Sequence, residues 1–196
     1  MNETTYAAHP HPRRRRRFVA LLFLALVSGT FGAGALSLAL YTSTSTASGS
    51  FTSGTIVLGT SPSTLFTVTA LMPGDTVDAT LAVSNTGTAQ LRYAMTTSAT
   101  NADTKELRDQ LTMTIKDQGT SCAAFDGTTL FSGALSAGAI GDPDQGAQAG
   151  DRTLDAATSE DLCFRVTLPS GTGNAFQGST TTATFTFDAE QTANNP

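Results

Sequence analysis

The stretch LMPGDTVDATLAVSNTGTAQLRYAM, residues 71–95, indicates the fold of this 196-residue chain. A Pro-Gly-Asp turn at 73–75 leads into a segment in which every second residue is apolar: Val77, Ala79, Leu81 and Val83. An Asn-Thr-Gly turn at 85–87 follows, and the same alternation returns at Leu91, Tyr93 and Met95. Strict alternation bounded by turns is typical of a β-strand with one face against a core. The stretch therefore predicts two consecutive strands.

The two-residue period recurs toward the C-terminus, in residues 111–115, 162–168 and 181–188. Shorter β-rich runs are predicted at 51–58, 65–71 and 129–135, the first two separated by a turn at 59–62. One short helix is predicted at 103–110, where the sequence DTKELRDQ has an acidic start and good helix formers. Residues 137–160 are rich in Gly, Ala and Asp without periodicity, and we expect a long surface loop there.

Roughly seven to nine short strands with little helix predict an all-β fold, a single β-sandwich. The periodicity does not distinguish jelly-roll from immunoglobulin-like topology. We expect the sandwich to span residues 51–190 and a polar tail to follow at 191–196. In the sandwich, residues 162, 164, 166 and 168 would face the core, which places Cys163 and Arg165 on the other face.

Residues 1–40 read as an export signal. Five consecutive arginines at 13–17 precede an apolar run at 18–27 and a small-residue segment at 28–40, an arrangement typical of a secretory signal peptide. The alternative is a retained membrane anchor, because residues 18–40 carry no charge and are long enough to span a bilayer. Membrane attachment is expected only through such an uncleaved signal. The arginines also loosely match a twin-arginine signal.

Cleavage is expected near residues 38–41, and the predicted positions are Ala39, Leu40 and Tyr41. Removal of residues 1–40 leaves six basic and 15 acidic residues. A chain of that charge has no electrostatic footprint for nucleic acid or for anionic lipid. The remaining length is enough for one ordinary domain with its own core.

The two cysteines, Cys122 and Cys163, are expected to form a disulfide in an exported chain. The enclosed loop of about 42 residues would stabilise the fold by roughly 4 kcal/mol in the chain-entropy model. With Cys163 off the core face, the bond would hold the Cys122 loop against the outside of a sheet.

No catalytic constellation is predicted. Both histidines, His9 and His11, lie in the first forty residues, so the rest of the chain lacks Ser-His-Asp, Cys-His and His-based zinc motifs. The carboxylate pairs at 142/144 and 160/161 are expected to be solvated loop charges. Asp142, Asp144 and Asp151 lie in one Gly-rich loop and are the best calcium candidates, but the spacing lacks the third ligand and distal Glu of a known calcium loop. We therefore predict no cofactor and assign no metal ligand.

Three stretches together resemble the TasA/CalY family of secreted fibre proteins, which includes camelysin. They are residues 29–58 with the motif FTSGTI at 51–56, residues 71–95 with both turns, and CFRVTLPSGTGNAFQGSTTTATFTFDAEQTANN at 163–195. The resemblance implies a jelly-roll-like sandwich, processing by a SipW-type signal peptidase, and extracellular fibres in a biofilm matrix or on the cell surface. Its implied partners are further copies of the chain, with a minor fibre subunit as an addition.

In such fibres the N-terminal strand of one subunit completes the sheet of the next, which is β-augmentation. The donor here would be residues 41–50, with an assembly strand at Tyr41, Thr42, Ser43, Thr44, Ser45, Thr46, Ala47 and Ser48. The alternative is a flexible linker, because only Tyr41 and Ala47 are apolar. A second functional alternative is a monomeric secreted adhesion or accessory module on the same fold. Camelysin is described as a metalloprotease, but we do not expect that activity here because the histidines precede the predicted cleavage site.

Overall fold

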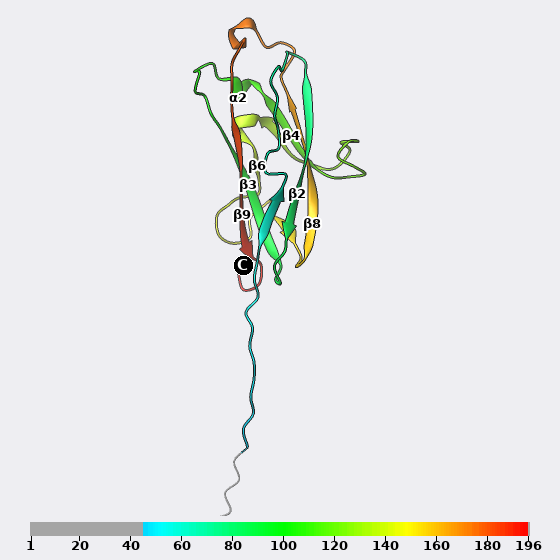
Figure 1. The fold of residues 1–196 in the computed structure, drawn as a ribbon, viewed down its shortest axis with the longest axis vertical. Helices are drawn as coiled ribbons and strands as arrows, with labels where there is room; N and C mark the ends of the chain where they lie inside the picture. The colour runs from blue at the N-terminus through cyan, green and yellow to red at the C-terminus, as the bar shows by residue number, and fades with distance from the viewer. Residues whose placement is uncertain (1–44, 196) are drawn as a thin grey trace, which may run out of the picture. The chain divides into compact units, whose positions relative to one another are not determined.

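In the computed structural model, which describes residues 45–195, the alternating stretch forms strand β2, Thr76–Asn85, and strand β3, Leu91–Ala99 (Figure 1). Residues 51–195 belong to one unit, whereas residues 45–50 belong to the preceding unit and form neither helix nor strand. The remaining elements are β1 (Leu58–Ser61), α2 (Leu107–Gln110), β4 (Thr112–Asp117), β5 (Thr129–Ala134), η1 (Leu135–Ala137), β6 (Ala139–Ile140), β7 (Arg152–Leu154), β8 (Thr158–Thr167), η2 (Asn174–Phe176) and β9 (Ala183–Gln191).

The strands form two antiparallel sheets that pack as a sandwich, which confirms the predicted fold class. The first sheet has the order β1-β2-β8-β4-β5. In the second sheet β3 is central, with β9 along one edge and β6 and β7 in succession along the other. Figure 1 shows β9 beside β3 and β8 beside β2. Neighbours in space are thus often far apart in sequence, as in Greek-key arrangements.

The core lies between the sheets and uses the predicted alternating residues. Its fully or nearly fully buried members include Leu81, Val83, Leu91, Tyr93, Met95, Leu111, Met113, Ile115, Leu162, Phe164, Val166 and Leu168. Phe185 and Phe187 of β9 are partly buried against this cluster. Burial of a side chain of this size contributes about 1.5–3 kcal/mol, so the alternation is the main source of the fold's stability.

The prediction for the first two β-rich runs is wrong. The strand falls on Leu58–Ser61, most of which was the predicted turn, because these residues pair with residues 82–85 of β2. Gly59 suits this pairing, since a Cβ atom there would lie 2.9 Å from the Ser84 hydroxyl. Residues 65–71 form no strand: Leu65 and Phe66 are consecutive and both pack against the core, which a strand does not permit.

The predicted helix and loop also differ from the structure. The helix is limited to Leu107–Gln110, because Thr104 and Glu106 have φ angles of 57° and 56° and the Asp103 carboxylate accepts a hydrogen bond from the Lys105 N–H. Residues 137–160, predicted as one loop, contain β6, β7 and the beginning of β8. These strand segments form because they pair with β3 and β2, and their own sequences show no alternation of apolar and polar residues.

The expected disulfide between Cys122 and Cys163 is present, with 5.0 Å between the Cα atoms. Cys163 lies opposite Thr80 and Lys116 in the first sheet, on the face away from the core cluster. It is nevertheless only 1% exposed. The bond therefore holds the Cys122 loop over the outer face of the sheet, as the alternation of β8 predicted.

Candidate functional site: an open seam between two sheet edges

Strand β2 has an outer edge that β1 covers only in part. β1 pairs with residues 82–85 and goes no further, so the first half of β2 has a strand neighbour only on its β8 side. The Leu168 N–H donates to the Asp75 carbonyl at 3.0 Å. By the alternation of an antiparallel ladder, the backbone N–H and C=O groups of the odd-numbered residues of β2 therefore point toward β8. Within the described chain, three residues consequently present unpaired backbone groups to the open side: Thr76, Asp78 and Thr80.

Strand β9 has a second open edge. It pairs only with β3 among the described residues. The Thr100 N–H donates to the Thr182 carbonyl at 3.0 Å, and the Thr192 N–H to the Gln90 carbonyl at 3.3 Å. The backbone N–H and C=O groups of the even-numbered residues of β9 therefore point toward β3. Those of four odd-numbered residues point outward: Ala183, Phe185, Phe187 and Ala189.

A groove of about 980 Å³ lies between these edges. Its apolar lining includes Leu65, Phe66, Val77, Leu81, Phe185 and Phe187. The ring of Phe185 contacts two others, with centroids 6.5 Å from Phe66 and 5.3 Å from Phe164. None of the described residues that line the groove is charged. We call this groove with its two strand edges the seam.

Residues 62–71, here named the plug segment, run along the seam. Leu65, Phe66 and Leu71 are partly buried against the core. In the described chain, however, no backbone hydrogen bond joins the plug segment to β2 or β9. The plug segment therefore covers apolar surface but leaves both strand edges without a hydrogen-bonding neighbour, an arrangement that favours addition of an external strand.

The residues predicted for processing and assembly are only partly described. Ala39, Leu40 and Tyr41, and the first part of the assembly strand at 41–44, lie outside the described residues. Ser45, Thr46, Ala47 and Ser48 are described and form no strand within one copy. Sequence reasoning missed the seam, because its two edges come from segments far apart in the chain. The one available sign was the adjacent apolar pair Leu65 and Phe66, which interrupts the alternation of residues 66–70.

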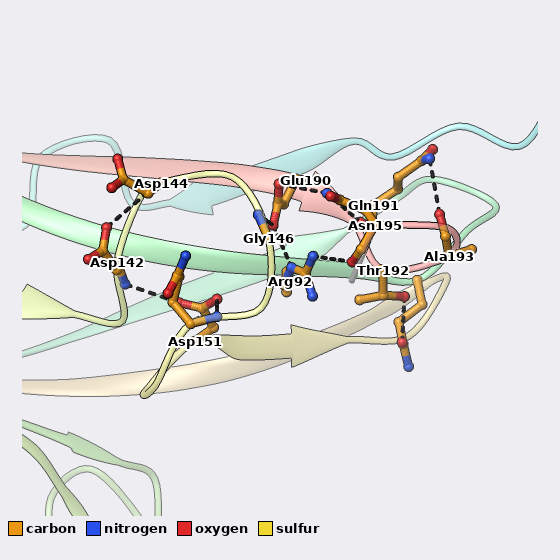
Figure 2. Close-up of polar contacts among 12 residues, drawn as sticks. Arg92, Asp142, Asp144, Gly146, Asp151, Glu190, Gln191, Thr192, Ala193 and Asn195 are labelled. Carbon is orange, nitrogen blue, oxygen red and sulfur yellow. Dashed lines mark hydrogen bonds and ion pairs between the residues drawn. The ribbon is translucent and has the colours of Figure 1, made fainter.

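The acidic loop considered for calcium is held by hydrogen bonds between its Asp side chains and its own backbone N–H groups (Figure 2). The Asp151 carboxylate accepts from the N–H groups of Asp142 and Gln148, at 3.0 and 2.8 Å. The Asp142 carboxylate accepts from the Asp144 N–H at 3.0 Å. These are turn-stabilising hydrogen bonds of the kind that Asp side chains make in loops. The carboxylates of Asp142 and Asp151 thus shape the loop, and Asp144 takes part through its backbone N–H.

A buried cation fastens that loop to β3 and β9 (Figure 2). Arg92, 7% exposed, forms an ion pair with Glu190 and donates to the Asn195 carbonyl. Glu190 also accepts from the Gly146 N–H at 3.0 Å and from the Asn195 amide at 2.7 Å. The hydrogen bond from Arg92 is the main reason that the pKa of Glu190 lies below its ordinary value. The described part of the predicted polar tail is therefore held by β3.

Glu160 is not the solvated charge that the sequence predicted. Its carboxylate accepts from the Tyr93 hydroxyl at 2.7 Å and from Arg152 Nε at 2.9 Å. Burial is the main reason that the pKa of Tyr93 is raised, and the hydrogen bond to Glu160 is the second reason. The hydrogen bond to Glu160 also raises the pKa of Arg152. Both residues lie in the second sheet and Glu160 in the first, so this triad connects the sheets and has a structural use.

The described residues do not form a site for a catalytic metal ion. Between residues 45 and 195, no three or more His, Cys, Asp or Glu side chains are grouped to hold a metal ion. Both cysteines are consumed by the disulfide, and both histidines precede residue 45. In the same span no helix has the length and apolar character needed to cross a bilayer.

Comparison with protein families finds one match. The model of the family described as camelysin metallo-endopeptidase matches residues 18–195. The chain matches no curated protein. The family match covers the sandwich, both strand edges of the seam and the N-terminal segment before it.

Proposed function

This chain belongs to the camelysin metallo-endopeptidase family, which is the TasA/CalY family, and we propose that it is a secreted structural subunit of extracellular or biofilm-matrix fibres. Residues 41–50 of one copy would form the donor strand that occupies the seam of the next copy. The observation that carries the proposal is the pair of unpaired strand edges on β2 and β9, on either side of one uncharged groove.

The physical basis is β-augmentation. An added strand satisfies the outward N–H and C=O groups of a sheet edge, and each such bond contributes about 0.5–1.5 kcal/mol net. The proposed donor contains neither charge nor proline and is rich in threonine, which favours extended structure. Because donor and acceptor are different surfaces, the contact is head to tail and can repeat without closing into a ring.

Export would precede assembly. Residues 1–40 would direct the chain out of the cell, and a SipW-type signal peptidase would free the donor near Tyr41. Exported chains of this composition carry about nine net negative charges, which repel one another at low ionic strength. An uncharged donor and an uncharged groove avoid adding to that repulsion.

We do not extend the peptidase activity in the family's description to this chain. The carboxylates of Asp151 and Glu160 take part in a turn and an ion pair, and no group of three or more His, Cys, Asp or Glu side chains among residues 45–195 could hold a metal ion. Incubation of the purified exported protein with casein tests this directly. Cleavage that a chelator abolishes, and that Zn²⁺ restores, would return the peptidase as the better function.

The decisive experiment compares two purified versions of the chain, one starting at Tyr41 and one at Phe51. Negative-stain microscopy should show filaments from the longer version and none from the shorter, with equal melting temperatures. Filaments from both would move the assembly strand out of residues 41–50. Monomers from both, across concentration, salt and pH, would remove the fibre proposal.

One alternative has its own support. The plug segment already fills part of the seam within a single copy, which would suit a monomeric secreted adhesion or accessory module. Such a module would add to fibres of another subunit without polymerising alone. Co-assembly of the purified chain with pre-formed fibres, in the absence of self-assembly, would favour this alternative.

A further inference from the structure

Phe51 is the most exposed of the large apolar side chains in the described chain, at 98%. We propose that Phe51 is an assembly anchor, whose ring inserts into the seam of a second copy. The inference rests on the proposed function and extends it, because it assigns a side-chain contact to an interaction otherwise described by backbone pairing. It also supplies the apolar contact that residues 41–50 lack.

The chain next to Phe51 is firmly held by its own domain. The Thr55 carbonyl accepts hydrogen bonds from the N–H groups of Thr88 and Ala89, at 2.8 and 3.0 Å. Gly87 permits this contact, because a Cβ atom there would lie 2.3 Å from the Thr55 carbonyl oxygen. Thr55 is therefore a fixed point, and Phe51 lies four residues before it in the chain.

From that fixed point Phe51 cannot reach the aromatic part of its own seam. Phe185 contacts Phe164, which lies opposite Ala79 in β2. Ala79 is seven strand positions from Thr86, a distance of about 24 Å along β2. Four residues of fully extended chain span at most about 14 Å. The shortfall of about 10 Å exceeds the length of a phenylalanine side chain, so the Phe51 ring that packs beside Phe185 would come from another copy.

The seam suits this occupant chemically. Its lining contains no charged residue, although the domain as a whole is acidic. Residues 41–57 are likewise uncharged. Phe66 and Phe185 offer ring faces and edges, and aromatic side chains favour such tilted or edge-to-face contacts. An aromatic side chain on an uncharged strand is therefore the ligand that this groove selects.

The first test measures assembly of the exported protein, collected from the medium after expression of the full chain. Phe51→Ala should raise the critical concentration for fibre growth by about tenfold to a hundredfold, the expected effect of losing a buried aromatic side chain. Phe51→Leu should restore most of the growth. Thr52→Ala is the matched control and should behave as wild type. All three should keep the wild-type melting temperature, because Phe51 is exposed within one copy.

The second test locates the ring. A photo-reactive phenylalanine at position 51 is introduced, and unlabelled and ¹⁵N-labelled copies are mixed before irradiation. Cross-links should join position 51 of one isotope to residues 62–71 or 181–187 of the other. Cross-links confined to one isotope, or to surfaces outside the seam, would overturn the inference.

The failures of the two proposals are distinguishable. Wild-type fibres that Phe51→Ala leaves unaffected would refute the anchor but keep the donor strand. An absence of wild-type fibres would refute the proposed function, and the anchor with it.

Discussion

The carboxylate of Glu160 on β8 accepts a hydrogen bond from the hydroxyl of Tyr93 on β3, at 2.7 Å, and so connects the two sheets of the sandwich. Arg152, which lies opposite Tyr93 in the second sheet, donates to the same carboxylate. Tyr93 is 1% exposed, and the side chains of Arg152 and Glu160 are 24% and 19% exposed. The triad thus places a charge pair in partly buried surroundings, where its loss is costly.

Replacement of Glu160 by Ala should destabilise the domain by about 2–4 kcal/mol, because it leaves the Arg152 charge and the Tyr93 hydroxyl without their partner. Glu160→Gln should cost less, since the amide oxygen can still accept from Tyr93. Urea unfolding followed by circular dichroism measures both. Asp144→Ala in the exposed loop is the control, and an equal loss there would contradict the importance of the triad.

Substitution by proline should affect the two edges of β9 differently, because proline has no backbone N–H. Ala183 directs its N–H outward, whereas Thr184 directs its N–H toward β3. Ala183→Pro should therefore leave folding nearly intact but reduce fibre growth, because the seam loses a donor group. Thr184→Pro should destabilise the domain by about 3 kcal/mol or more, since it removes a ladder hydrogen bond.

Thermal melting and negative-stain microscopy of this pair of variants test the assignment. Fibres of Ala183→Pro that grow at the wild-type rate would exclude this end of β9 from the assembly edge. Equal destabilisation by both substitutions would contradict the register derived for the strand.

Gly87→Ala should release the N-terminal segment from the turn after β2. The added Cβ would lie 2.3 Å from the Thr55 carbonyl oxygen and 2.8 Å from the Ile56 Cα atom, both in the main chain. We expect a cost of about 1–3 kcal/mol. Hydrogen exchange should accelerate at the amides of Thr88 and Ala89, which bond to Thr55. Gly171→Ala, with no atom within 4 Å of its Cβ, should change neither property.

Stability should fall at acid pH through two ion pairs. Arg92 lowers the pKa of Glu190 below its ordinary value of 4.5, and Arg165 lowers that of Asp78 below 3.8. A depressed pKa in the folded state contributes stability that is complete above the unfolded pKa and is lost as pH falls through the folded value. The free energy of unfolding should therefore decline below about pH 4.5.

Urea titrations from pH 7 to pH 2.5 measure this decline. The double variant Glu190→Gln, Asp78→Asn should show a smaller fall than wild type over the acidic range. An identical acid dependence in the two proteins would assign the loss to other carboxylates.

Several features of the domain were predictable because they depend on local pattern. The alternation in β2, β3, β4 and β8 specifies which face of each strand is buried, since successive side chains of a strand point to opposite faces. The same rule placed Cys163 off the core face, where the disulfide lies. Resemblance in three separate stretches predicted the family that the match over residues 18–195 shows.

Other features were beyond local pattern because they depend on contacts between distant segments. β1 formed within a predicted turn, and β6 and β7 formed within a predicted loop, since each is stabilised by pairing with a longer strand. Glu160 appeared to be a solvated charge until the fold brought Tyr93 and Arg152 to it.

The amino-acid sequence by itself determined the β-sandwich, its core faces, the disulfide and the uncharged segment at residues 41–57. Tertiary structure alone decided that β1 stops short on β2, and that β9 has one edge with no neighbouring strand among residues 45–195. It also decided that an uncharged groove of these residues lies between the two edges. The physical reason is that side-chain periodicity records which face of a strand is buried, whereas a strand's hydrogen-bonding partners depend on where other strands end.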